Sequence, residues 1–275
     1  MPHGAAAGVM ALAAAALVTQ SAAYTATATR PTPLAPDYVD GWAVTPKRST
    51  WQGRELMCLV VSDDPSVDNL HSVAHPDHPR YRAFEELEDP HGALGVWPSA
   101  YAACASLQKI ASQLKRPPTV LELGCGAGLP SLYASVVLES PRVVATDVEA
   151  VPLAFLEAAR SAHVETGSFA TCTLDVTYAA VDDIRGFDVV VCADMLYNTD
   201  VATALGALLG AAACGAGAPE FVVCDPGRRG RDHFLDAFGA ASGLSPMFVD
   251  QAVPDGCVDV FDGTPIGAVG VLAAR

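Results

Sequence analysis

Three glycines alternate with other residues in the segment TVLELGCGAGLPSL (119–132), which runs from an apolar, strand-like stretch into a helix-like one. Gly124, Gly126 and Gly128 have no Cβ atoms, so the main chain can turn tightly there and approach a ligand closely. Glu122 places a carboxylate at the expected end of the strand, where it would form charge-assisted hydrogen bonds with a cation. The segment therefore predicts a site for a positively charged ligand.

The glycine spacing differs from both common phosphate-binding motifs. The dinucleotide fingerprint is GxGxxG, whereas this segment reads GxGxG, with Leu129 where the third glycine would stand and Pro130 at the expected first helical position. A P-loop needs GK[ST], which the segment lacks. A plain glycine-rich turn remains the alternative to a ligand-binding loop.

Two further acids follow later apolar stretches. Asp147 ends RVVATD (142–147), where a carboxylate can accept hydrogen bonds from both ribose hydroxyls. Asp175 ends ATCTLD (170–175), within reach of an adenine amino group. Each acid alone could be a solvated strand end. Together with the glycine segment, the three acids predict a ligand with an amino-acid part, a ribose and an adenine.

These features resemble the S-adenosylmethionine site of class I, seven-strand methyltransferases. The resemblance covers roughly residues 55–272 and extends to the small lysine methyltransferases of non-histone proteins, a group that includes the calmodulin-lysine and electron-transfer-flavoprotein β-subunit enzymes. Four segments carry it in the expected order: GVWPSA (95–100), GAGLPSL (126–132), FDVVVCADMLYNTD (187–200) and VVCDPGRRG (222–230). The last segment most resembles the flavoprotein-subunit branch, but VWPS and CAD also occur in the calmodulin branch, so the substrate stays open.

The resemblance implies S-adenosylmethionine as the cofactor and assigns roles to individual residues. Trp97 would pack near it, Glu122 and the three glycines would line its methionine part, Asp147 would bind the ribose and Asp175 the adenine. The family often has Trp-Gly after the third-strand acid, whereas this chain has Val176 and Thr177, which weakens the adenine assignment. The implied cofactor-binding set is Trp97, Glu122, Gly124, Cys125, Gly126, Gly128, Asp147, Val148, Asp175, Val176 and Ala193.

The D-x-x-Y motif of the family maps onto Asp194 to Tyr197, beside the methyl group, which makes these two residues the implied catalytic pair. Asp194 would orient the target ammonium, and the Tyr197 ring would lie against the methyl donor or the target side chain. The alternatives are a helix cap for Asp194, although Thr199 and Asp200 are better placed for capping, and simple packing for Tyr197.

The stretches that position these residues alternate between strand-like and helix-like, which predicts an α/β fold with a parallel sheet covered on both faces. The last two strands leave no room for a helix between them and should be antiparallel. The resemblance implies a Rossmann-like, doubly wound seven-stranded sheet in the order 3-2-1-4-5-7-6 with strand 7 antiparallel. Predicted strands are 119–123, 142–147, 170–175, 187–194, 220–225, 247–253 and 266–274; predicted helices are 130–138, 150–163, 178–184, 199–213 and 231–241.

The region before the glycine segment divides into three parts. Residues 1–36 form an Ala-rich leader, either a signal or transit segment or a disordered leader with no targeting role. Residues 37–95 are expected to be an extension with a small hairpin over 41–62 and a loop, and 96–275 the methyltransferase domain, which opens with a helix over 99–114 capped by Ser99. The sequence leaves the location open between the cytoplasm and, if the leader is a targeting segment, a plastid or mitochondrion.

The amino-acid composition limits the classes of partner that this chain is expected to bind. With 31 acids against 16 Lys and Arg, of which only three are Lys, the chain has a formal net charge of −15, which argues against nucleic-acid binding. The one dense basic cluster, Arg228, Arg229 and Arg231, could meet an acidic substrate such as calmodulin or be solvated charge near a helix start. We expect a monomer without a membrane span.

Other titratable residues predict no metal site and no disulfides. The eight cysteines form no CxxC pair, and Cys125, Cys192 and Cys224 lie in or beside apolar runs, as reduced core thiols do. The histidines 71, 75 and 78 have a spacing that a metal could use, but a surface loop is the expected reading.

The function that these residues predict is a protein-lysine N-methyltransferase acting on a non-histone protein. The alternatives are a small-molecule amine N-methyltransferase and a catalytically idle, cofactor-binding interaction module. Both members of the D-x-x-Y pair are present, which counts against the idle module.

Overall fold

A computed structural model describes residues 38–40, 42–62, 91–163, 167–260 and 263–274. The predictions made for the leader (1–36), for most of the loop after residue 62 and for the three histidines fall outside these residues.

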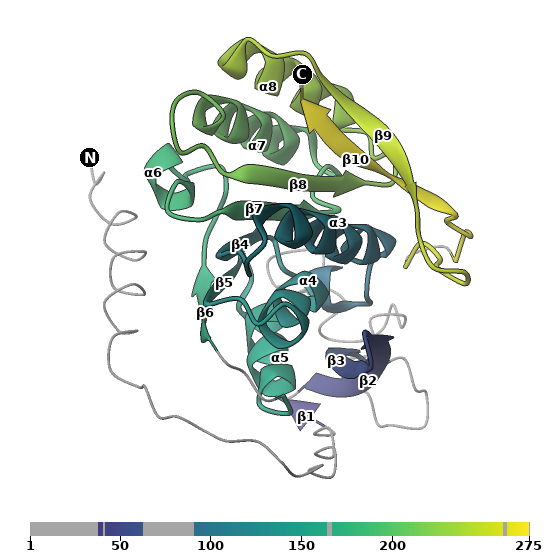
Figure 1. Ribbon diagram of the computed structural model, residues 1–275. Helices are drawn as coiled ribbons and strands as arrows, with labels where there is room; N and C mark the ends of the chain where they lie inside the picture. The colour runs from purple at the N-terminus through teal and green to yellow at the C-terminus, as the bar shows by residue number, and fades with distance from the viewer. Residues whose placement is uncertain (1–37, 41, 63–90, 164–166, 261–262, 275) are drawn as a thin grey trace, which may run out of the picture.

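The central element is a mixed seven-stranded sheet (Figure 1). Its order is β6-β5-β4-β7-β8-β10-β9, and only β10 runs antiparallel to its neighbours, β8 and β9. This arrangement confirms the predicted order 3-2-1-4-5-7-6 with an antiparallel strand 7. The strands are β4 (Val120–Leu123), β5 (Arg142–Asp147), β6 (Ser168–Thr173), β7 (Val189–Ala193), β8 (Glu220–Asp225), β9 (Pro246–Ala252) and β10 (Ala268–Ala274).

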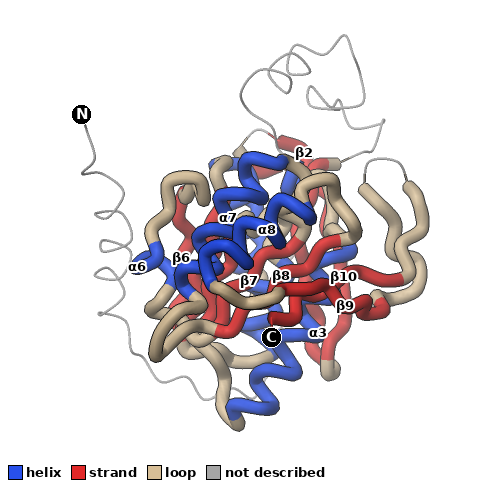
Figure 2. The backbone as a smooth tube through the Cα atoms, turned by 90° about the horizontal axis from the view of Figure 1, so that it is seen from above, coloured by secondary structure: helices blue, strands red, loops and turns tan. Residues whose placement is uncertain are grey.

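Both faces of the sheet are buried, as its apolar strands require. In β7, Val189 and Val191 join one hydrophobic cluster while Val190 and Cys192 join the other. Figure 2 shows α7 and α8 on one side of the strands and α3 on the other. The helices are α3 (Pro98–Leu114), α4 (Leu129–Leu132) with a following π-helical turn (Tyr133–Val137), α5 (Ala150–Arg160), α6 (Val181–Ile184), α7 (Thr199–Ala212) and α8 (Arg231–Ser242).

Several predicted boundaries need correction. Helix α3 begins at Pro98 and its N-cap position is Trp97, so Ser99 is not the cap. The Ser99 side chain is fully buried instead, and its hydroxyl oxygen makes no hydrogen bond within the described part of the chain. Strand β6 ends at Thr173, two residues earlier than predicted, because the chain turns at Asp175.

The predicted hairpin is confirmed. Strands β2 (Trp42–Trp51) and β3 (Arg54–Val61) pair antiparallel around Gln52 and Gly53, and β1 (Tyr38–Val39) adds a short third strand. Six residues of β3, Leu56 to Val61, are buried against the same cluster as the sheet. A domain boundary at residue 95 stays a prediction.

The cysteine prediction is confirmed, since all eight cysteines are free and Cys125, Cys192 and Cys224 are buried. Cys214 is exposed and Cys257 is partly exposed, so not every thiol belongs to the core. Across the described residues, no helix combines the length and apolar character needed to cross a membrane.

The starts of β4 and β7 are joined by Asp188. Its Oδ2 accepts hydrogen bonds from the Thr119 main-chain nitrogen at 2.7 Å and hydroxyl at 2.8 Å, and its Oδ1 pairs with Nη2 of Arg116 at 2.6 Å. These donors, Arg116 first, hold the pKa of Asp188 well below its ordinary value. The resulting stabilisation is complete above the pKa of an unfolded aspartate, about 3.9, and declines as the pH falls below it.

Replacing Asp188 with asparagine should therefore destabilise the fold by about 2 kcal/mol at pH 7. Chemical denaturation should show that the variant and the wild type differ clearly less in their free energy of unfolding at pH 3 than at pH 7. Asp250, exposed on the edge strand β9, provides the matched Asp250→Asn control, which should change neither value. An equal loss for Asp188→Asn at both pH values would contradict the assigned linkage.

Candidate active site

The glycine segment after β4 is a left-handed turn against which other parts of the protein pack. Gly124, Gly126 and Gly128 have φ angles of +65°, +50° and +72°, a region that L side chains rarely adopt. A Cβ at Gly126 would lie 2.4 Å from the Gly92 carbonyl oxygen. At Gly124 and Gly128 it would meet the side chains of Met195 and Leu156. The glycines were expected to admit a ligand, but neighbouring segments of the protein already require them.

Glu122 is enclosed by the fold. It is only 1% exposed, and its Oε2 accepts hydrogen bonds from the main-chain nitrogen of Ser131, at 3.0 Å, and from the Ser131 hydroxyl. Burial raises the pKa of Glu122 to about 8, against the effect of the two Ser131 bonds. The expected carboxylate at an open mouth is therefore a buried group that braces the glycine segment against α4. Near neutral pH it stands close to its titration point.

Asp147 lies at the end of β5 and closes the turn from the other side. Its Oδ2 accepts from the Gly126 main-chain nitrogen at 2.9 Å, and its Oδ1 accepts from the Glu149 nitrogen at 3.1 Å. The residue is 8% exposed, and burial raises its pKa. Cys125 is also buried and donates its main-chain nitrogen to the Thr146 carbonyl at 2.8 Å. The structure thus joins the glycine segment directly to the acid predicted for the ribose.

The residues expected near an adenine lie beyond β5 and β6. Asp175 is partly buried and accepts from the Thr177 nitrogen at 2.9 Å and hydroxyl at 2.7 Å. Val176 is 6% exposed, whereas Val148 and Tyr178 are 52% and 79% exposed. Val148 follows the end of β5 and Tyr178 follows Asp175, and each exposes an apolar side chain to solvent.

Asp194 follows the last residue of β7, the partly exposed Ala193, in a left-handed conformation with φ +62°. Its main-chain nitrogen donates to the Cys224 carbonyl at 2.9 Å, and the residue as a whole is 8% exposed. Burial raises the pKa of Asp194, and the guanidinium of Arg228 opposes this rise. The alternative capping role is wrong, because Asn198 caps α7 through bonds to the nitrogens of Asp200, at 2.8 Å, and Val201, at 3.2 Å.

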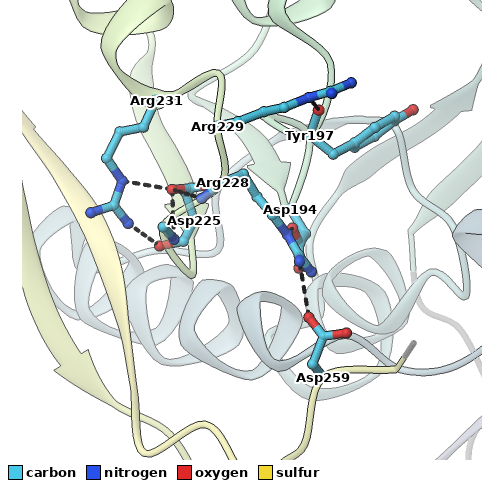
Figure 3. A network of polar contacts seen from close by, with 8 residues as sticks. Asp194, Tyr197, Asp225, Arg228, Arg229, Arg231 and Asp259 are labelled. Atoms are coloured by element: carbon cyan, nitrogen blue, oxygen red, sulfur yellow. Dashed lines mark hydrogen bonds and ion pairs between the residues drawn. The ribbon is translucent and has the colours of Figure 1, made fainter. Parts of the chain in front are cut away.

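Arg228 binds Asp194 through two parallel hydrogen bonds. Its Nε lies 2.7 Å from Oδ1 and its Nη2 lies 3.1 Å from Oδ2 (Figure 3). On the other side, Nη1 lies 2.9 Å from Oδ2 of Asp259, in the loop between β9 and β10. The guanidinium carbon is 5.5 Å from the centre of the Trp97 ring, a distance that permits a cation–π contact. Four separate chain segments therefore meet at this guanidinium.

Two members of the basic cluster, Arg228 and Arg231, are not solvated charge. Arg231 donates its Nε to Oδ2 of Asp225, at 2.6 Å, and Asp225 is fully buried. Asp225 also accepts from the Gly227 nitrogen at 2.9 Å, which holds the loop after β8. Arg229 is exposed and donates its Nε to the Tyr197 carbonyl at 2.8 Å. Two of the three arginines are thus paired with acids of the chain, which leaves little free positive charge for an acidic substrate.

Tyr197 is 54% exposed, which does not fit a simple packing role. In Figure 3 its ring points away from the Asp194–Arg228 pair, and the main chain at Tyr197 is held by Arg229. The aromatic ring is therefore free to meet a molecule that approaches this edge of the sheet.

Three residues that shape the site were not predicted from the sequence: Gly92, Asp225 and Asp259. Asp225 had a detectable signal, since an acid at a strand end followed by Pro-Gly-Arg-Arg belongs to one of the recognised segments. Gly92 and Asp259 come close to the site only in the folded chain, so their spacing in the sequence carries no signal.

No group of three or more His, Cys, Asp or Glu side chains that could hold a metal ion occurs in the described ranges.

Comparison with known proteins gives a family match and distant structural matches. A family model described as "Lysine methyltransferase" matches residues 76–238, more than half of the chain. A search of curated proteins found no significant match. Among solved structures, a magnesium protoporphyrin IX methyltransferase from Synechocystis PCC 6803 with bound SAH is 13% identical, with a TM-score of 0.45 over 65% of this chain and 84% of its own. The methyltransferase domain of bacterial CtHen1 is 15% identical, with a TM-score of 0.41 over 64% of this chain and 98% of its own.

Proposed function

Because the chain belongs to the lysine methyltransferase family, whose model spans residues 76–238, we propose that it methylates a lysine side chain of a non-histone protein. It is an S-adenosylmethionine-dependent methyltransferase. The observation that carries the proposal is the position of Asp194, which is buried, conformationally strained and next to the glycine segment through Met195. Strained backbone positions for non-glycine residues cluster at functional sites.

The residues around the glycine segment fit the cofactor in their chemistry. Asp147 offers carboxylate oxygens for ribose hydroxyls, and the exposed side chains of Val148 and Tyr178 offer an apolar surface for an adenine. Glu122, whose pKa burial raises to about 8, would be shifted toward its ionised form by a cation bound nearby. Asp175 and Val176 would border the adenine, while Trp97 and Ala193 would border the site from the α3 and β7 sides.

When bound, S-adenosylmethionine supplies an electrophilic methyl group for in-line displacement by an amine. The target lysine must first lose a proton, which costs on the order of 4 to 5 kcal/mol at pH 7 for an ordinary pKa of about 10.4. Asp194 would orient the ammonium through hydrogen bonds and help to pass its proton to water. The exposed Tyr197 ring would lie along the target side chain. Alignment by these groups can lower the barrier by several kcal/mol.

The proposal is tested by incubating the purified protein with a proteome extract and radiolabelled S-adenosylmethionine, followed by identification of the labelled band. We expect labelling of a protein at lysine, reduced about 100-fold or more when Asp194→Asn replaces the wild type. Parallel assays with small amines test the alternative of metabolite methylation. Label on metabolites alone, or no label in any fraction, would contradict a protein-lysine methyltransferase.

Replacing Asp147 with asparagine should weaken cofactor binding by about tenfold or more. The amide group of asparagine has only one oxygen, so it can accept a hydrogen bond from the main-chain nitrogen of Gly126 or of Glu149 but not from both. Calorimetry with S-adenosylhomocysteine measures the change. Glu220, exposed at the opposite end of β8, gives the control Glu220→Gln, which should bind normally. Unchanged affinity in Asp147→Asn would remove Asp147 from the cofactor site.

A further inference from the structure

The Asp194 carboxylate has a defined orientation because a guanidinium fork holds both of its oxygens. Bidentate arginine–carboxylate pairs add geometric precision to their electrostatic energy. The backbone at Asp194 is in the left-handed region, which an isolated aspartate would leave readily. The ion pair with Arg228 and the main-chain bond to Cys224 explain why the residue stays there.

Several contacts fix the position of the Arg228 side chain. Asp225 accepts from its main-chain nitrogen, at 3.1 Å to Oδ2, so the start of the side chain is anchored in the loop after β8. The guanidinium lies near the Trp97 ring and pairs with Asp259, and the side chain is only 21% exposed. A cation held between two carboxylates and a ring has little freedom to leave Asp194.

Asp259 is held in place by the described part of the loop between β9 and β10 (residues 253–260 and 263–267), here termed the β9–β10 loop. Its main-chain nitrogen donates to the Thr264 carbonyl at 2.8 Å, and its own carbonyl accepts from Gly263 at 3.0 Å. The next residue, Val260, packs so closely on Gly95 that a Cβ there would lie 2.9 Å from its Cγ2 atom. The loop is therefore seated on the segment that leads into α3 and Trp97.

The net charge of the Asp194–Arg228–Asp259 group favours binding of a lysine ammonium. Two carboxylates, Asp194 and Asp259, against one guanidinium leave one net negative charge. A carboxylate offers about four acceptor positions, so Asp194 can bind Arg228 and still accept from an ammonium. The pair with Arg228 is thus compatible with substrate binding.

We propose that Arg228 is a positioning residue for methyl transfer, which orients Asp194 toward the target amine, and that Asp259 makes the β9–β10 loop part of the same device by holding Arg228. This inference rests on the proposed function, because it assigns Asp194 to the lysine. It extends the site from the ends of the parallel strands to a loop at the antiparallel edge of the sheet.

Kinetics on a lysine peptide that the wild type methylates test the proposal. Arg228→Gln should lower kcat about 100-fold and Arg228→Lys about tenfold, with S-adenosylhomocysteine affinity within threefold of wild type, because misorientation affects the reacting geometry. Asp259→Asn should lower kcat about three- to tenfold by loosening Arg228. Asp255, exposed on the same loop, supplies the matched Asp255→Asn control, which should stay within twofold of wild type.

Carbon NMR of the Asp194 carboxyl group in the free protein gives a second readout, the pKa of Asp194. If Arg228 and Asp259 had only a structural role, their removal would not shift this pKa in opposite directions. Loss of the Arg228 cation should raise the pKa of Asp194, whereas loss of the Asp259 negative charge should lower it. Asp194→Asn identifies the resonance. The charged and titratable groups that act on or are coupled to Asp194 are Arg228, Asp225, Asp259, Tyr197 and Cys224.

Higher activity in Arg228→Gln would show that the guanidinium blocks the site, and unchanged kcat in both Arg228 variants would show that it does not act on Asp194. Either result overturns the proposal. If Arg228→Gln fails to fold, Arg228→Lys and Asp259→Asn still decide. A wild type that methylates no peptide would overturn the proposed function instead, while the NMR shifts would still show whether Arg228 and Asp259 control Asp194.

Discussion

Asparagine in place of Asp194 is expected to reduce methyl transfer about 100-fold or more, the usual range for a group that handles a proton in the reaction. The substitution keeps the size of the side chain and one oxygen that can accept from Arg228, but it removes the negative charge that would orient the ammonium. Cofactor affinity should stay within a few fold, since the glycine segment, Asp147 and Asp175 are untouched. Single-turnover rates and calorimetry with S-adenosylhomocysteine measure the two quantities separately.

The matched control is Asp236→Asn, which makes the same chemical change at an exposed position on α8. It should leave both the transfer rate and the cofactor affinity unchanged. If Asp194→Asn lost affinity in proportion to its rate, Asp194 would belong to the cofactor site. If it turned over normally, the residue would have no part in transfer.

Alanine in place of Gly126 should destabilise the protein by roughly 2–4 kcal/mol and weaken cofactor binding at least tenfold. The φ angle of +50° is unfavourable for alanine, and the new Cβ would lie 2.4 Å from the Gly92 carbonyl oxygen. A main-chain atom cannot move aside as a flexible side chain can. Relief of the overlap must displace the main chain at Gly92 or at Gly126, and movement at Gly126 disturbs the hydrogen bond from its nitrogen to Asp147, now 2.9 Å long.

Gly217 separates the two causes, because its φ angle is +79° and no atom lies within 4 Å of the position of an added Cβ. Gly217→Ala should cost only about 1 kcal/mol, the contribution of the backbone conformation alone. Denaturant titration compares the two variants, and calorimetry reports cofactor affinity. Equal stability losses would mean that the contact with Gly92 has no energetic importance.

The parallel character of the sheet was predictable from local sequence, whereas its strand order was implied by the family resemblance. Continuous β-branched runs such as FDVVVCAD must be buried on both faces, and this requires a parallel sheet between helix layers. Hairpin β2–β3 was equally visible, from two strand-like runs around Gln52 and Gly53. Element ends were less predictable: Ser99 has the chemistry of a cap, but Pro98 can occupy the first turn and shifts the start of α3 by one residue.

The candidate site was predictable where one short segment contains both a turn and its acid. Gly124 to Gly128 needed no tertiary information, since a glycine-rich turn after a strand is a local feature. The partners of that turn were not accessible, because Gly92, Leu156 and Met195 approach it from three distant segments. The glycines were read as room for a ligand, whereas the packing shows that the fold itself requires them.

The sequence alone determined the order of strands and helices, the glycine turn and the acids at the strand ends, because each depends on residues that are neighbours in the chain. Tertiary structure decided which charges meet. Arg228 looked like surface charge beside Arg229 and Arg231, but folding places it between Asp194 and Asp259, 34 residues before it and 31 after it. Charge pairing depends on distance in space, and only the folded sheet and its β9–β10 loop establish that distance.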